Sequence, residues 1–187
     1  LKDLKKELAE KETAIKATED LLAEIKLAAR ELPQPSKVTS ANESAIADLM
    51  ETVENTLDTH NKKLTDAQKK ELTEIRNGLT NKMDVIETVA NKIETIEADA
   101  TTIPSVAQVT GNDEDAILAL EKAIDDTLAT YANGETVNLT DVETKKLNDI
   151  KADLAVKKAM IERVASEVEE LEALAKEIPS IDKVTSA

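Results

Sequence analysis

The chain has 187 residues, of which 39 are acidic and 24 basic, and its formal net charge is −15. A surface this acidic repels the phosphates of nucleic acids and the headgroups of anionic lipids, so we expect neither nucleic-acid binding nor direct membrane binding. There is no Cys, Trp or Phe and only one Tyr, which excludes disulfides, thiolate metal sites and aromatic binding platforms. The abundance of Ala, Glu, Lys and Leu is typical of long helices or coiled coils.

The first 32 residues predict one long helix. Their apolar residues recur at the three- and four-residue steps that place side chains on one helix face. The residues of this stripe are Leu1, Leu4, Leu8, Ile15, Leu22, Ile25, Ala29 and Leu32. Lys11 interrupts the stripe, and a connector with two prolines, residues 33–39, follows it.

A short helix is predicted next, at about residues 42–60. Its apolar face consists of Ile46, Leu49, Val53, Leu57 and His60. Glu43 follows Ser40 by three residues, which predicts a capping box at the start of this helix. After a short turn at residues 61–63, Thr65 and Gln68 predict a second capping box, where another long helix begins.

The same series of elements then repeats. The connector that begins at Leu32 returns at Ile103 and begins a third time at Ile178, so the repeat offsets are 71 and 75 residues. Self-similarity at such a period indicates supersecondary units stacked along a line, which act through extent and surface rather than through one buried active site.

The second copy differs from the first mainly in one turn. Its short helix begins after Gly111, a tolerated N-cap, and its apolar face consists of Ile117, Leu120, Ile124, Leu128 and Tyr131. The following turn, residues 132–138, contains Asn133 and Gly134, which both tolerate positive φ and therefore favour a turn. This longer turn explains the larger offset, and the sequence Leu-Thr-Asp at residues 139–141 then starts the next long helix.

All three long helices carry a lysine near the middle of the apolar stripe, namely Lys11, Lys82 and Lys157. One interpretation is that the aliphatic stem packs while the ammonium reaches water. The other is that the stripe changes partner helices at this point. A long helix of about 38 residues spans about 57 Å and a short one about 30 Å, so one short helix covers only half of a long one.

We therefore predict an all-α fold of tandem up-down-up three-helix bundles, joined by shared long continuous helices into an elongated rod. Residues 1–82 would form the first bundle, starting within the long helix of a preceding repeat, and residues 83–157 the second. Residues 158–187 would be the truncated first helix and connector of a following bundle. A competing layout breaks the second long helix within residues 77–84 and folds it back.

This architecture leaves two apolar segments without partner helices. We expect both to be partly exposed, or covered by end-to-end contacts between the truncated helices of neighbouring molecules. The residues of these segments are Leu1, Leu4, Leu8, Ile161, Val164, Val168 and Leu171.

The residues indicate no catalytic, cofactor-binding or metal site, and we expect no enzyme activity. His60 is the single histidine, and Tyr131 occupies its position in the second copy. A catalytic or metal-ligating role of the histidine would not survive this replacement. The acidic groups at residues 113–115 and 125–126 lack the alternating oxygen ligands and glycine turn of a calcium loop. Acidic residues near helix starts already have an explanation in the helix dipole.

The repeat resembles the helical repeats of Gram-positive cell-wall-anchored surface proteins. The residues that carry this resemblance are Ile103-Pro104-Ser105, Val109-Thr110, Ala116-Ile117 and Leu139-Thr140-Asp141. Bundles joined by shared long helices also resemble spectrin repeats and giant staphylococcal adhesins. The resemblance implies an extracellular rod attached to the cell wall, and some relatives with helical bundles bind immunoglobulin, albumin or matrix proteins.

Three functions are compatible with these observations. The leading hypothesis is a structural spacer or stalk that projects an adhesive or catalytic domain from the cell wall. The second is a helical module whose bundle face binds a host protein such as immunoglobulin, albumin or a matrix component. The third is an intracellular coiled-coil scaffold, which a signal peptide and a wall-sorting tail in the full-length gene would exclude.

Overall fold

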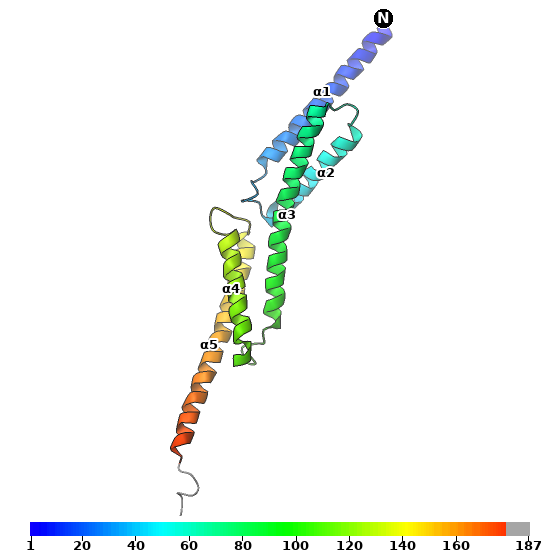
Figure 1. Ribbon diagram of the computed structural model, residues 1–187. Helices are drawn as coiled ribbons and strands as arrows, with labels where there is room; N and C mark the ends of the chain where they lie inside the picture. Colours follow the sequence, from blue (N-terminus) through cyan, green and yellow to red (C-terminus); the bar gives the residue numbers. More distant parts are fainter. Residues whose placement is uncertain (179–187) are drawn as a thin grey trace, which may run out of the picture. The chain divides into compact units, whose positions relative to one another are not determined.

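The computed structural model describes residues 1–178, and in this range the chain is all-helical, as predicted. The elements in chain order are α1 (Lys2–Glu31), η1 (Ser40–Asn42), α2 (Glu43–Thr59), α3 (Asp66–Thr102), η2 (Gly111–Asp113), α4 (Glu114–Tyr131) and α5 (Asp141–Glu177). Figure 1 shows the two short α-helices, α2 and α4, each followed by a long one. The third copy of the connector, from Pro179 onward, lies outside the described residues.

The long helix α3 runs without a break for 37 residues, so the competing layout that folds it back within residues 77–84 is wrong. Gly78 lies inside this helix on its exposed side, and no neighbouring atom lies within 4 Å of the position a Cβ would take. A glycine there weakens the helix without serving a close approach of another chain segment.

Replacing Gly78 with alanine should raise the free energy of unfolding by about 0.5–1 kcal/mol, because alanine loses less backbone entropy in a helix. The matched control is Gly134→Ala, which should lower it, because Gly134 has φ of 88°, where an alanine side chain is strained. Urea unfolding followed by circular dichroism measures both. A destabilising Gly78→Ala would show that this part of α3 is not helical in solution.

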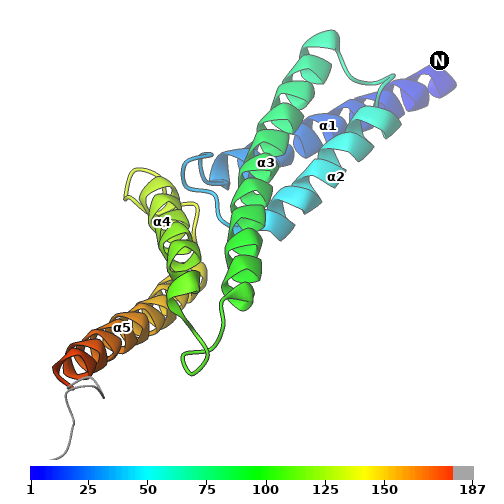
Figure 2. The same ribbon diagram turned by 60° about the horizontal axis from the view of Figure 1, so that its bottom comes forward.

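The chain divides into two compact units, and α3 contributes to both. The first unit comprises residues 1–91 and 130–141. Its core draws residues from α1, the connector after α1, α2, the turn before α3 and the part of α3 up to Ile86. Figure 2 shows α1, α2 and this part of α3 side by side. The buried residues of this core are Leu22, Ile25, Val38, Ile46, Leu49, Val53, Leu64, Leu72, Leu79 and Ile86.

The second unit comprises residues 92–129 and, within the described range, 142–178. Its buried apolar residues come from the end of α3, the second connector, α4 and α5. These residues are Ile93, Ile96, Ile103, Val109, Ile117, Leu120, Ile124, Leu147, Leu154 and Ile161. An ion pair joins Lys146 of α5 to Glu97 of α3, and another joins Lys151 of α5 to Asp125 of α4 at 2.5 Å. The predicted bundle boundaries after residues 82 and 157 remain predictions.

Both cores also bury threonines on the predicted apolar faces. Thr56 of α2 and Thr127 of α4 occupy equivalent positions, and each donates its hydroxyl to the carbonyl four residues earlier in its own helix, at 2.7 Å in both cases. Thr18 of α1 does the same at 2.9 Å. These hydroxyls are therefore satisfied without any contribution from a neighbouring helix.

The predicted capping box at Ser40 and Glu43 is wrong by one residue. The box is formed instead by Thr39 and Asn42, whose Oδ1 accepts a hydrogen bond from the Thr39 amide at 3.0 Å. Thr110 and Asp113 form the equivalent box in the second copy, where Gly111 is the first residue of η2 rather than its N-cap. The shift arises because each short helix begins with a 3₁₀ turn, which the sequence pattern did not indicate.

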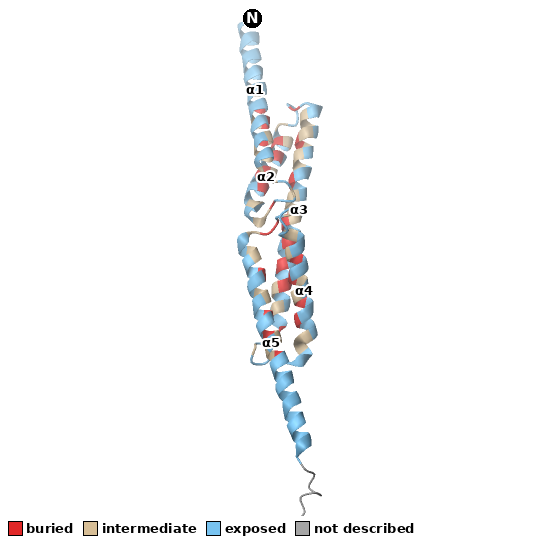
Figure 3. Ribbon diagram, turned by 90° about the vertical axis from the view of Figure 1, so that its left-hand side faces the viewer, coloured by how far each residue is buried: buried red, intermediate tan, exposed pale blue. Residues whose placement is uncertain are grey.

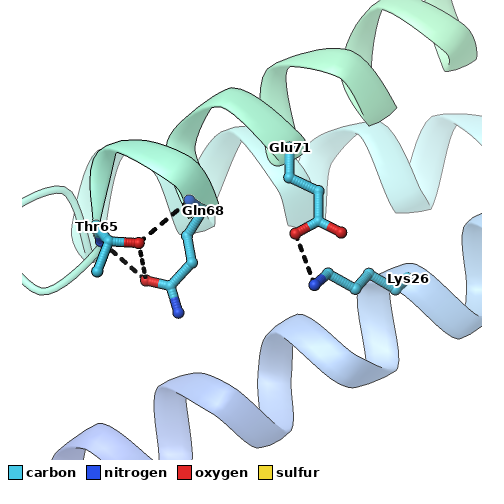
Figure 4. A network of polar contacts seen from close by, with 4 residues as sticks. All are labelled: Lys26, Thr65, Gln68 and Glu71. Carbon is cyan, nitrogen blue, oxygen red and sulfur yellow. Dashed lines mark hydrogen bonds and ion pairs between the residues drawn. The ribbon is translucent and has the colours of Figure 1, made fainter.

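The capping box at Thr65 and Gln68 is confirmed at the start of α3. The Thr65 amide donates to Gln68 Oε1 at 2.8 Å, and the Gln68 amide donates to Thr65 Oγ1 at 3.2 Å (Figure 4). One turn further along, Glu71 forms an ion pair with Lys26 of α1 at 2.6 Å. This end of α3 is thus fixed both by its own cap and by a charged contact to α1.

Candidate interaction surfaces

The structure places His60 and Tyr131 at the ends of two different short helices. His60 is half-buried at the end of α2, where its Nδ1 lies 2.8 Å from the hydroxyl of the adjacent Thr59. Tyr131 is half-buried at the end of α4, in the other short helix. Residues 1–178 contain no group of three His, Asp or Glu side chains that could hold a metal ion. Nor does any helix in this range have the length and apolar character needed to cross a membrane.

The three lysines of the long helices have different environments. Lys157 is buried, and its ammonium forms an ion pair at 2.7 Å with Asp153, whose carboxylate is half-exposed one turn earlier. Lys11 is exposed and pairs with Glu7 at the same spacing, whereas Lys82 is half-buried. At Lys157 the stem packs while the ammonium meets a carboxylate at the surface, which favours the interpretation of a packed stem at that position.

One hollow of about 280 Å³ lies between the end of α3 and the start of α4. Its lining consists of Asp99, Thr102, Ile103, Ala116, Ala119, Leu120 and Ala123. Asp99 is the single titratable residue of this set, so the hollow offers neither an acid–base pair nor an activated nucleophile.

Two apolar stripes are exposed on the surface, one at the start of α1 and one at the end of α5. Leu1, Leu4 and Leu8 are exposed as predicted, and so are Val164, Val168 and Leu171. Ile161 is the exception, because it is buried in the second unit, one turn beyond the predicted end at Lys157. Figure 3 shows both ends of the described chain in the pale blue of exposed residues.

The central helix α3 shows how these stripes behave when neighbouring helices are present. Leu8 is 58% exposed, whereas Leu79, its equivalent in α3, is 1% exposed. Val168 is 47% exposed, whereas its equivalent Ile93 is 6% exposed. Equivalent apolar residues are thus buried in α3 but exposed to solvent at the start of α1 and at the end of α5. The two stripes are therefore candidate surfaces for further helices.

A third feature, which the sequence did not indicate, is a contact between the turn after α4 and the connector after α1. Asn138 is almost fully buried there, and its Nδ2 donates to the carbonyl oxygens of Pro35 and Val38 at 2.8 and 2.7 Å. The amide of Val137 donates to the carbonyl oxygen of Ser36 at 2.8 Å. Both segments belong to the first unit.

Comparison with known proteins identified no relative of this chain. No family model, no curated protein and no solved structure matches the chain.

Proposed function

We propose that this chain is part of the spacer of a surface protein, extracellular and attached to the cell wall, which holds another domain away from the wall. It would do so as tandem three-helix bundles joined by shared long helices. The observation that carries this proposal is that α3 supplies core residues to both compact units, with Leu72 and Leu79 in the first and Ile93 and Ile96 in the second. A helix shared in this way lets units follow one another without a flexible linker.

The chemistry of the surface supports a passive role. The formal charge of −15 keeps a long protein soluble and discourages association between copies. Most ion pairs lie between exposed side chains one turn apart in the same helix, such as Lys122 with Asp126 and Lys145 with Asp149. Such pairs support individual helices by a few tenths of a kcal/mol, roughly 0.2–0.5, rather than form a recognition surface.

The proposal predicts how size changes with repeat number. One further copy of residues 83–157, inserted after Lys157, stays in phase with the repeat and should lengthen the particle by about 30 Å, the length of a short helix at 1.5 Å per residue. Small-angle X-ray scattering of chains with no, one and two inserted copies measures this. A radius of gyration that follows the scaling of compact domains, with an exponent of about 0.38, would contradict the proposal.

The binding hypothesis needs a separate control. The same chain, immobilised and exposed to serum and to extracts of extracellular matrix, should retain no immunoglobulin, albumin or matrix protein above the level of an unrelated acidic helical protein. Specific retention of one of these proteins would favour the host-binding module over the spacer. Scattering and retention are independent readouts, so a rod that also binds a host protein would be recognised as such.

A further inference from the structure

The turn of residues 132–138 has a fixed shape of its own. The side chain of Asn133 accepts hydrogen bonds from the amides of Glu135 and Thr136 at 3.0 and 2.8 Å, and Gly134 supplies the positive φ that this turn requires. The amide of Asn138 donates to the carbonyl oxygen of Tyr131 at 2.9 Å, which closes the base of the turn. The side chain of Asn138 is therefore held by a turn whose shape is already fixed by its own hydrogen bonds.

This turn meets the connector of the preceding repeat through four hydrogen bonds. Besides the two from Asn138 and the one from Val137, Lys37 Nζ donates to the carbonyl oxygen of Gly134 at 2.5 Å. Donors thus come from both sides of the contact. Val38, whose carbonyl accepts one of these bonds, is fully buried. The side-chain Nδ2 of Asn138 donates both of its hydrogens to this connector, so the donor capacity of the carboxamide is completely matched.

The turn of the first repeat is built differently. Residues 61–63 close with hydrogen bonds from the amides of Lys63 and Leu64 to the carbonyl oxygen of His60. Lys63 occupies the position before the Leu-Thr-Asp sequence that Asn138 occupies in the second repeat, and its side chain is exposed. This shorter turn contains no Asn-Gly pair, and the residue immediately before its Leu-Thr-Asp sequence is a lysine rather than an asparagine.

We propose that residues 132–138 are a docking segment for the Pro-containing connector of the preceding repeat, and that Asn138 is the residue that recognises it. The first unit includes residues 130–141 of the second repeat, so it is complete only when that repeat follows. The contact thereby makes the stability of one repeat depend on its neighbour, as a nearest-neighbour term does in repeat proteins. A repeat with the short turn of residues 61–63 has Lys63 in place of Asn138, so it lacks the carboxamide that makes two of these bonds.

Asn138→Ala tests this proposal through hydrogen exchange of the native protein. Loss of the two bonds to Pro35 and Val38 should speed exchange of the Val137 amide, and of the α2 amide of Val53 in the core of the first unit, by about tenfold. The Ile124 amide in α4 of the second unit should change less than twofold. The matched control is Asn148→Ala in α5, whose carboxamide is exposed and bonds only to the carbonyl of Thr144 within its own helix.

A second variant keeps the test decisive if Asn138→Ala perturbs folding. Lys37→Met removes an exposed ammonium and its bond to Gly134, and should speed exchange of the Val137 amide by about two- to fivefold while leaving the helices intact. Unchanged exchange of Val137 and Val53 in both variants would overturn the proposal. Equal acceleration in both units would overturn it as well, because the effect would then be a general loss of stability.

Discussion

Replacing Ile117 with alanine is expected to lower the free energy of unfolding by about 2–5 kcal/mol. Ile117 in α4 is fully buried in the second unit, so its removal costs both the transfer of the side chain from water and the cavity left behind. Urea unfolding followed by circular dichroism at 222 nm measures the change, and an unchanged dependence on urea concentration indicates an effect on stability rather than on compactness.

The adjacent residue provides a matched control. Leu118 has a side chain of the same size in the same turn of α4, but it is 41% exposed. Leu118→Ala should therefore cost less than about 1 kcal/mol, since little apolar surface returns to water and alanine favours the helix. Similar losses for the two variants would mean that the assigned apolar face of α4 is not the one that packs in solution.

A proline in the middle of α3 should have the second large effect. Asn81→Pro removes the amide that donates within the helix and places the proline ring against the carbonyl of Asn77, which costs about 3 kcal/mol or more. Asn81 is exposed, so the substitution removes no packing contact. The loss should appear both in urea unfolding and as reduced helical ellipticity.

The same variant discriminates between the two layouts of the long helix. A chain that broke at Thr80 and Asn81 would accept proline there at a cost below about 1 kcal/mol, because neither residue would then need helical hydrogen bonds. Asn81→Ala is the control, and it should leave the stability unchanged or slightly raised. A tolerated proline would therefore contradict the continuous helix and, with it, the sharing of α3 between two units.

Most of the fold could be predicted from the sequence because apolar periodicity and repetition are local signals. Ile46, Leu49 and Val53 of the first short helix are buried, as the pattern predicted, and so are their equivalents in the second. The start of α3 at Asp66 and that of α5 at Asp141 followed from the Leu-Thr-Asp sequences. These features depend only on residues within a few turns of each other.

Two features were not predicted because they depend on exact backbone geometry or on contacts between segments far apart in the sequence. The capping boxes at Thr39 and Thr110 lie one residue earlier than expected, because the first turn of each short helix is a 3₁₀ turn. The contact of Asn138 joins segments about one hundred positions apart, and no local pattern distinguishes such an asparagine from one in an ordinary turn. The one available signal was the extra length of the second turn, which accounted for the offset but not for a contact.

The buried threonines have a consequence for the exchange of one short helix for the other. The hydroxyls of Thr56 and Thr127 donate to carbonyl oxygens of their own helices. These core positions therefore need no hydrogen-bond partner on a neighbouring helix. Unmatched polar groups are what usually penalise a wrong neighbour in a core. One copy of the short helix could therefore replace the other without new complementary substitutions at these two positions.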